Sequence, residues 1–493
     1  LLFNLIKFHF FFLIRYYSDM NTISNENLPK SIRYSMGSAN AVQSSTVLSR
    51  FSSVNGTTFS STSSNQVRIK IRGNGFLQVD KHYLEFTITT ATAAAQIDTH
   101  AGSFIDRIRI ESQGQIVEEL NNYGLFNAIK QNYNTDVNEL YKKNAESGSG
   151  KLAIKFEPTQ IGLAAADNAA AVKVVTDAAF AADNGKLFEV ERDAAGELIA
   201  TGNSKVFCIQ LESGLLKNAK ALPDGLNEID LILTLASDTQ AMVSAGAATY
   251  TMTNPTLYIP AMRVENADVM ASYRQVVAQE GVMWSGVSQK SYVNALPLAA
   301  GTPVLQINDR SLSCLGFVTA IQAATANATN ASYSNGAFGY TDVTGTTKIN
   351  RFRYIIQGDN FPQSDILINV ADDGLNIARA TEESCKALAP MGHNYCDSLI
   401  SKTKAVSQFD LAYAVSPATG GTDCPCALLS VDLKRTSNDG MRMVGMNTAQ
   451  NSSPSVLELN VSVALAAACT ATTYALVESF YQMDSQGGLS SAM

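Results

Sequence analysis

The feature that most restricts the fold is a series of short runs in which apolar and polar residues alternate with a period of two. In VRIKIRG, residues 67–73, Val67, Ile69 and Ile71 fall on one face and three basic residues on the other. The same alternation recurs in HYLEFTITTA, SFIDRIRIES and LNEIDLILTLAS. Because successive side chains of a strand point to opposite faces, these runs predict half-buried antiparallel strands.

The strand candidates form two groups on either side of a helical stretch, NADVMASYRQVVAQEG. In each group a helix candidate lies midway, NNYGLFNAIKQNY in the first and GLNIARATEESCKAL in the second. The second group contains MWSGVS, SYVNAL, VLQIND, LGFVTAIQ, FRYIIQG, DILINV, FDLAYAV, ALLSVDL, SVLELNVSVAL and TYALVESFYQM. We therefore predict an all-β chain with one sandwich over residues 67–265 and a second over 266–493, which begins with a helical linker at 266–280.

Two further segments stand outside these sandwiches. Residues 20–66 read as a basic arm, because no acidic residue occurs between Asn27 and Val79 while Lys30, Arg33 and Arg50 do. This arm either lies against a polyanion or an anionic membrane face, or is a solvated tail. Residues 144–203 are rich in Ala, Asp, Gly and Lys with weak periodicity, and we expect a long inserted loop there.

The first nineteen residues, LLFNLIKFHFFFLIRYYSD, directly precede Met20 and resemble translated upstream sequence. A signal peptide or membrane anchor is the alternative. It is disfavoured because Asn4, Lys7 and His9 interrupt the apolar run and no small-residue cleavage site follows.

Charge and cysteine content restrict the partners and the compartment. Charged residues make up only 16% of the 493-residue chain, against about 25% in typical soluble proteins. A largely neutral surface suits contact with other copies, and a net charge of -8 argues against general nucleic-acid binding. Seven cysteines give no disulfide framework and indicate a reducing compartment.

Motifs for catalysis and phosphate binding are missing from the sequence. There is no HExxH helix and no Gly-x-Ser-x-Gly elbow. Ser149-Gly150-Lys151 resembles the end of a phosphate loop, but Ala145 and Leu152 replace the Gly and the Ser or Thr that such a loop needs. Gly73-Asn74-Gly75 lacks a third glycine and reads as a tight turn between strands. We expect no catalytic residues, no cofactor-binding residues and no cofactor.

Two groups of residues are candidate metal ligands. Asp372-Asp373-Gly374 precedes a helix candidate, and capping of that helix suits it better than a calcium loop, whose further oxygen ligands are missing. His393, Cys396, Cys424 and Cys426 form a possible zinc set, but Cys-x-Cys fits the usual knuckle poorly, and small core thiols are the preferred interpretation. We expect no required metal. Trp284, the only tryptophan, lies in an apolar strand and is expected in the core.

Four segments, in this order, resemble a known family: SFIDRIRIESQGQIVEELNNYGLF at 103–126, GLLKNAKALPDGLNEIDLILTL at 214–235, FRYIIQGDNFPQSDI at 352–366 and GMNTAQNSSPSVLELNV at 445–461. Together they resemble the double jelly-roll major capsid proteins of double-stranded DNA viruses, especially those of Polinton-like viruses and virophages. The resemblance covers residues 67–484, and the insertion at 144–203 has no counterpart in it.

The resemblance implies two tandem eight-stranded antiparallel jelly rolls with a few short helices and long inserted loops. It also implies a structural, non-enzymatic protein of the virion shell, assembled inside the host cell. Three chains would form a homotrimeric, pseudo-hexameric capsomer that tiles an icosahedral shell. Expected partners are neighbouring capsomers and minor or penton capsid proteins, with the N-terminal arm facing the genome or an inner membrane.

Two other classes compete with this interpretation. A jelly-roll carbohydrate-binding surface protein, similar to a lectin, shares the architecture and an Asn- and Thr-rich surface, but aromatic and calcium sites for sugars are missing. A β-sandwich hydrolase would need a triad or paired carboxylates, and the sequence has no such signature.

Overall fold

The computed structural model describes residues 44–73, 75–149, 152–156, 188–192, 195–244, 247–323, 335–336, 338–339, 349–370, 374–375, 378–391, 426–434, 444–450, 453–462, 464–465 and 468–492. All of them belong to one compact unit, Ser44–Met493. Residues 1–43, including most of the predicted arm, lie outside the described residues.

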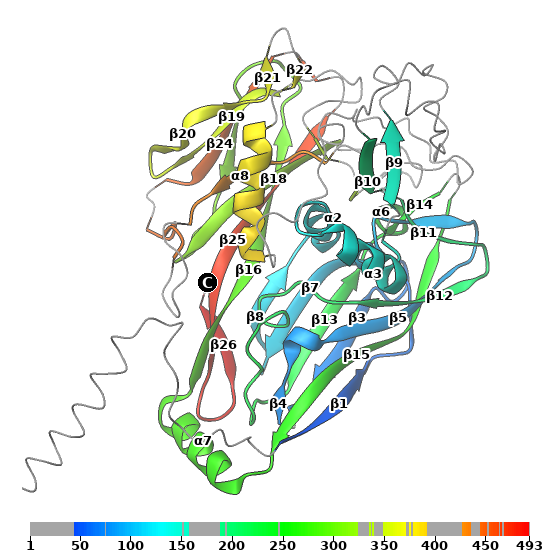
Figure 1. The fold of residues 1–493 in the computed structure, drawn as a ribbon, viewed down its shortest axis with the longest axis vertical. Coiled ribbons are helices and arrows are strands. Elements are labelled where there is room, and N and C mark those ends of the chain that lie inside the picture. The colour runs from blue at the N-terminus through cyan, green and yellow to red at the C-terminus, as the bar shows by residue number, and fades with distance from the viewer. Residues whose placement is uncertain are drawn as a thin grey trace, which may run out of the picture. The chain divides into compact units, whose positions relative to one another are not determined.

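The first sandwich consists of two antiparallel sheets with four main strands each, β1-β15-β5-β12 and β3-β13-β7-β8 (Figure 1). The short strands β2 (Thr58–Phe59) and β4 (Phe76–Leu77) also belong to the first sheet, where they pair with β15. The strands are β1 (Ser44–Ser52), β3 (Gln66–Ile71), β5 (Tyr83–Thr90), β7 (Ile105–Ser112), β8 (Gln115–Leu120), β12 (Ser204–Ile209), β13 (Ile229–Leu235) and β15 (Tyr250–Val264). Alternation in the sequence matches burial: in β13, buried Ile229, Leu231, Leu233 and Leu235 alternate with half-buried residues. Their side chains form a core with those of β3, β5 and β7.

The second sandwich repeats this arrangement with sheets β16-β25-β18-β23 and β17-β24-β19-β20. Its strands are β16 (Val282–Leu296), β17 (Val304–Ile307), β18 (Cys314–Ala323), β19 (Ile349–Ile356), β20 (Asp359–Leu367), β23 (Leu429–Asp432), β24 (Ser455–Val461) and β25 (Cys469–Met483). In both sandwiches strands one, eight, three and six form one sheet, and strands two, seven, four and five the other. The predicted pair of eight-stranded antiparallel jelly rolls is confirmed.

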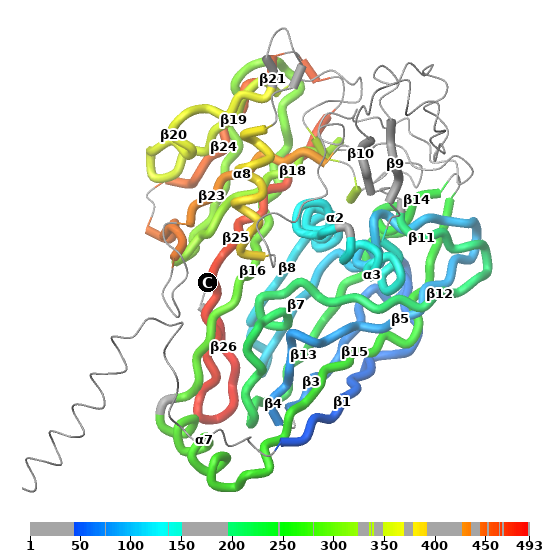
Figure 2. The backbone as a smooth tube through the Cα atoms, in the orientation of Figure 1, coloured from blue at the N-terminus to red at the C-terminus, as the bar shows by residue number. Residues whose placement is uncertain are grey.

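Helices occupy equivalent connections. Between the fifth and sixth strands lie α2 (Tyr123–Tyr133) and α3 (Val137–Ser147) in the first sandwich, and α8 (Ala378–Leu388) in the second. Helix α7 (Ala267–Glu280) joins the two sandwiches, and the Asn266 side chain caps it by accepting from the Asp268 and Val269 N–H groups. The tube in Figure 2 runs from β15 through α7 into β16.

Short elements complete the described chain. The short strands are β2 (Thr58–Phe59), β4 (Phe76–Leu77), β6 (Ala95–Asp98), β9 (Leu152–Phe156), β10 (Phe188–Arg192), β11 (Ala195–Ile199), β14 (Met242–Val243), β21 (Asn369–Val370), β22 (Gly374–Leu375) and β26 (Leu489–Ala492). The short helices are α6 (Asp238–Ala241), η2 (Val79–Lys81), η3 (Ala101–Phe104) and η5 (Ala389–Met391). No helix among the described residues is both long enough and apolar enough to cross a membrane.

Three predictions need correction. The arm does not extend to Gln66, because Ser44–Ser52 forms strand β1 and pairs with β15 along its whole length. The segment at 144–203 is not all loop: it includes the end of α3 and strands β9, β10 and β11, while residues 157–187 lie outside the described part.

The second predicted helix begins later than expected. Gly374 belongs to β22, which pairs with β21, and α8 begins at Ala378. Asp372 and Asp373 lie outside the described residues, so their capping role stays a prediction. At Gly374 and Leu375, pairing with β21 prevails over the helical pattern of the sequence. The predicted strand FDLAYAV lies outside the described residues.

Candidate assembly surfaces

Helix α2 of the first sandwich packs against the outer face of the second sandwich. Ten of its eleven residues are buried, and the exception is Gln131. Leu125, Phe126 and Ile129 belong to a third apolar core that also contains residues of β18, β25 and α8. The ring centroids of Phe126 and Tyr474 are 5.2 Å apart. Because this core is shared, the sandwiches are joined by apolar burial as well as by the chain.

Hydrogen bonds fix the position of α2 in this junction. The Tyr474 hydroxyl donates to the carbonyl oxygen of Asn122 at 2.9 Å, just before the helix. At the other end, the Tyr133 hydroxyl donates to the Cys426 carbonyl at 2.9 Å. These bonds satisfy polar groups that burial would otherwise leave without partners.

Strands β16 and β25 extend beyond the second sandwich and complete the core of the first. We call this extension, residues 282–288 paired with 477–483, the limb. Trp284, Tyr481 and Met483 are buried in the core of the first sandwich, and the Trp284 and Tyr481 rings lie 6.0 Å apart. A Cβ on Gly214 would lie 2.6 Å from the Tyr481 hydroxyl, so this approach requires glycine. The expectation that Trp284 is a core residue is confirmed, although the core belongs to the other sandwich.

A buried carboxylate, that of Glu118 on β8, binds the limb to the first sandwich. It accepts hydrogen bonds from the Ser213 hydroxyl at 2.5 Å, the Gly214 N–H at 2.9 Å and the hydroxyl of Ser288 on the limb. Glu478, on the limb, accepts in the same way from two groups of the second sandwich, the Ser313 hydroxyl at 2.8 Å and the Val444 N–H at 3.0 Å. Multiple donors allow a buried carboxylate to remain in the protein interior.

A cluster of charged side chains holds α2 to the segment after β12. Glu212 forms ion pairs with both Lys130 and Lys217, at 2.6 Å for Lys217. Burial lowers the pKa of Lys130 to about 7. Burial alone would raise the pKa of Glu212, but the two ammonium groups outweigh it, and the pKa lies below its ordinary value. Glu212 is therefore ionised and holds the two lysines together.

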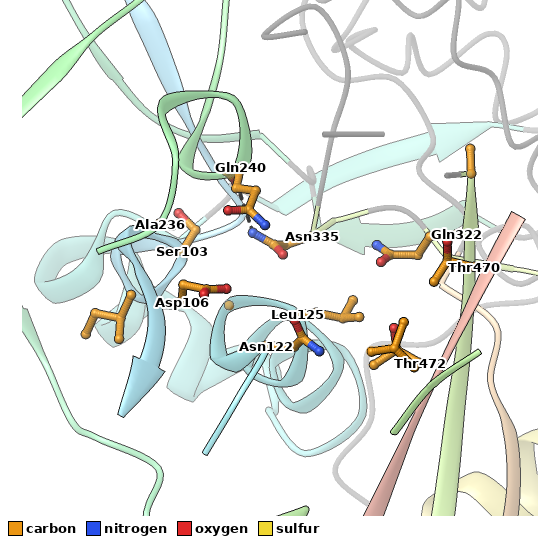
Figure 3. A pocket seen from close by; sticks show the side chains of 14 residues that line it. Ser103, Asp106, Asn122, Leu125, Ala236, Gln240, Gln322, Asn335, Thr470 and Thr472 are labelled. Atoms are coloured by element: carbon orange, nitrogen blue, oxygen red, sulfur yellow. Dashed lines mark hydrogen bonds between the residues drawn. The ribbon is translucent and has the colours of Figure 1, made fainter. Parts of the chain in front are cut away.

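A polar pocket of about 150 Å³ lies between the two sandwiches. Figure 3 shows Asp106 from β7, Gln240 from α6 and Thr472 from β25 around it. Burial raises the pKa of Asp106. Asn335, which lines the pocket, is held by Asp98: the Asp98 carboxylate accepts from the N–H groups of Asn335 at 2.6 Å and Gly336 at 3.1 Å. Amide and hydroxyl groups dominate the lining, which suits water better than an apolar ligand.

The outer faces of two sheets carry ion pairs. On β3-β13-β7-β8, Arg68 pairs with Asp230 at 2.5 Å, and Lys70 and Arg72 both pair with Glu228. On β17-β24-β19-β20, Arg353 pairs with Glu458 at 3.0 Å. These faces are exposed, and each such pair contributes little to stability. The basic side chains that follow the predicted arm are thus neutralised by acidic neighbours.

The residues considered from sequence as candidate sites are only partly described. His393, Cys396, Cys424, Gly150, Lys151 and Asn74 lie outside the described residues. Cys426 is buried, and its thiol donates to the Gly336 carbonyl at 3.6 Å. Gly75 has a φ of 99°, a backbone geometry that suits glycine in a tight turn. Within the described ranges, no cluster of three or more His, Cys, Asp and Glu side chains is arranged to bind a metal.

Sequence reasoning missed the junction residues. Glu118 and Glu119 are adjacent in a strand, so one of the two must face inward. This pair was the one sign in the sequence that a carboxylate is buried here. Glu212 and Lys130 are 82 positions apart, and no local pattern connects them.

Comparison with known proteins identifies the fold. No protein-family model and no curated protein sequence matches the chain. Among solved structures, the Faustovirus major capsid protein is similar with a TM-score of 0.57 at 9% identity, over 91% of this chain and 92% of that one. PBCV-1 VP54, fitted into a reconstruction of the virophage Sputnik, gives a TM-score of 0.54 at 12% identity, over 93% and 99%. The chain has the double jelly-roll fold of viral major capsid proteins.

A third double jelly-roll structure agrees. A chain of the Sputnik virophage gives a TM-score of 0.52 at 12% identity, over 95% of this chain and 92% of that one. Because the double jelly roll accounts for nearly all of each matched chain, the resemblance noted from sequence is borne out at the level of the fold.

Proposed function

We propose that this protein is the major capsid protein of a double-stranded DNA virus of the Polinton-like or virophage type. It is a structural, non-enzymatic protein that resides in the virion shell and is assembled inside the host cell. The observation that carries the proposal is the similarity of the double jelly roll to capsid proteins over 91% to 95% of this chain. Little of the chain is left for a separate catalytic domain.

The working unit in this proposal is a homotrimer. Two equivalent sandwiches in each chain place six around a threefold axis, so a trimer of identical chains approximates a hexagonal tile. Such capsomers pack with their neighbours and with minor or penton capsid proteins. The residues before Ser44 face the genome or an inner membrane, where Lys30 and Arg33 provide positive charge.

Light scattering after size exclusion, combined with electron microscopy, tests this proposal. The full-length protein at micromolar concentration in physiological salt should have three times the 52.7 kDa chain mass and should form shells or flat hexagonal arrays. A stable monomer would contradict the proposal. Binding of a glycan array by that monomer would favour the lectin-like alternative.

A further inference from the structure

Residues 211–218, which follow strand β12, contact both halves of the junction between the sandwiches. We call them the connecting segment. The Glu212 N–H donates to the Tyr123 hydroxyl of α2 at 2.7 Å. The Asn218 side-chain amide donates to the carbonyl oxygen of Ser285 on the limb at 2.7 Å. A change that displaces the connecting segment therefore acts on α2 and on the limb together.

The start of the connecting segment is held by a buried imidazole, that of His82. The His82 side chain is 0% exposed. Its Nε2 atom accepts from the Leu211 N–H at 2.8 Å, and its Nδ1 atom lies 2.5 Å from the Val79 carbonyl oxygen. Because a backbone N–H only donates and a carbonyl oxygen only accepts, both bonds form only when the ring is neutral and carries its proton on Nδ1.

Protonation of His82 is incompatible with its bond to the connecting segment. The second proton would lie on Nε2 and face the Leu211 N–H, and two donors cannot share a hydrogen bond. The Nδ1 bond to Val79 would remain, so the charged ring would keep its place beside η2. The Leu211 N–H would then lose its acceptor in the protein interior, which favours movement of the connecting segment away from the ring.

The surroundings of His82 oppose its protonation at neutral pH. Burial lowers the pKa of His82, and the Lys217 ammonium group acts in the same direction. The carbonyl groups of Val79 and Leu216 and the carboxylate of Glu212 act in the opposite direction and are outweighed. The other titratable or charged groups on the elements packed around the ring and the connecting segment are Asp80, Lys81, Glu118, Tyr123, Lys130, Glu139 and Lys143.

Mild acid acts on His82 before it acts on the charged cluster beside it. A histidine whose pKa is lowered by folding binds its proton first in the unfolded chain, so stability is full above about pH 6.5 and falls below it. Lys130, with a pKa of about 7, is already charged in this range. Glu212, whose pKa lies below its ordinary value of 4.5, loses its charge only in stronger acid.

We propose that His82 is an acid-sensitive switch of the junction: its protonation in mildly acidic solution releases the Leu211 N–H and loosens the connecting segment that holds α2 and the limb. The junction is tight at neutral pH and loosens in an acidified compartment. This inference concerns the single chain and does not depend on the proposed function. In a virion shell it would make every copy of the protein labile to acid.

Hydrogen exchange of the full-length wild-type protein at pH 7.5 and pH 5.5, followed by peptide mass spectrometry, tests the inference without a variant. After correction for the intrinsic pH dependence of exchange, the amides of residues 211–217 should lose protection at least about fivefold at pH 5.5. Equal protection at the two pH values would overturn the inference.

Two matched variants assign the effect to one ring. In His82→Gln, the side-chain oxygen can accept from the Leu211 N–H but does not titrate between pH 5.5 and pH 7.5. The control is His100→Gln: His100 is the other histidine among the described residues, is 4% exposed, and accepts from the Gly102 N–H within one turn of chain. Protection of residues 211–217 should be independent of pH in His82→Gln and should fall in His100→Gln as in the wild type. A pH-dependent loss that survives in His82→Gln would overturn the inference.

Urea denaturation gives a second readout that compares pH values within each variant, so a general loss of stability in His82→Gln does not affect it. Between pH 7.5 and pH 5.5, the equilibrium constant for folding should fall about tenfold more in the wild type than in His82→Gln. The same fall in both proteins would place the acid sensitivity elsewhere and overturn the inference.

Discussion

Individual buried carboxylates determine how segments of this protein meet. Glu118, Glu478 and Asp98 each accept hydrogen bonds from backbone N–H groups or serine hydroxyls of segments distant in sequence. A buried charge is tolerated only when such donors surround it, so each carboxylate selects one arrangement of the neighbouring chain. The carboxylates therefore contribute specificity to junctions whose stability comes from apolar burial.

Replacing Glu118 by Ala should destabilise the protein strongly. The Ser213, Gly214 and Ser288 donors would lose their acceptor inside the protein, and we expect the free energy of unfolding to fall by roughly 3 kcal/mol. The neighbouring residue Glu119 forms only a half-exposed pair with Arg107 at 3.5 Å, so Glu119→Ala should cost less than about 1 kcal/mol. Urea denaturation of both variants measures the difference, and equal losses would contradict this role of Glu118.

Among the elements, strand β1 is the first in the described part of the chain. It lies at the edge of its sheet, pairs only with β15 in the described structure and is largely exposed on both sides. Such an edge strand contributes to the stability of the unit through its backbone hydrogen bonds and through the partly buried side chain of Phe51, which packs against the core. The folded unit therefore includes residues from Ser44 onward and does not begin near Gln66.

Two deletions distinguish the arm from the strand. Removing residues 20–43 should leave the melting temperature of the trimer within about 2 °C of the wild type, because it removes no described pairing, while shells should form with lower yield or lower salt resistance. Removing residues 20–52 also removes β1 and should lower the melting temperature by several degrees. Normal shells from the shorter deletion would show that the arm is only a solvated tail.

Periodicity in the sequence predicted most strands, and the exceptions have physical explanations. Strand β13 alternates strictly because one face is buried, whereas β1 shows no alternation because neither face is fully buried. Strand β16 is fifteen residues long, whereas the sequence pattern predicts two strands there, MWSGVS and SYVNAL. Strand β15 is equally long, and its register shifts at a bulge around Asn254-Pro255.

The junction between the sandwiches was beyond sequence reasoning. Its contacts join residues that are hundreds of positions apart, such as Tyr474 and Asn122. Period-two patterns report only that a face is buried, and do not identify what covers it. Strand β25 is buried on both faces at its centre, and its residues 474–477, Tyr-Ala-Leu-Val, show no alternation for that reason.

At the scale of the whole molecule, the two sandwiches are one cooperative body. The limb places Trp284, Tyr481 and Met483 of the second half in the core of the first, and α2 of the first half lies in a core shared with the second. Neither sandwich keeps its apolar surface buried when the other unfolds.

Cooperativity predicts a single unfolding transition. Trp284 is the only tryptophan, so intrinsic tryptophan fluorescence reports on the limb alone, while far-ultraviolet circular dichroism reports on all strands. The two signals should give the same urea midpoint for the dissociated chain, within experimental error. A control variant, Val304→Lys, carries its substitution outside the limb, so its fluorescence and circular dichroism midpoints should also agree with each other. Two separated midpoints would show that the sandwiches unfold independently.

The limb also limits what can be exchanged between relatives of this protein. A chimera that joins residues 44–265 to the second half of another double jelly-roll protein would inherit a foreign limb. Its first sandwich would then lack the indole of Trp284 and the Tyr481 ring, whose hydroxyl lies beside Gly214. The first sandwich would therefore be destabilised although its own sequence is kept, because its core would be incomplete. Recombination in this fold is therefore expected to succeed at surface loops and to fail at the linker helix, although the linker is the boundary that the sequence itself suggests.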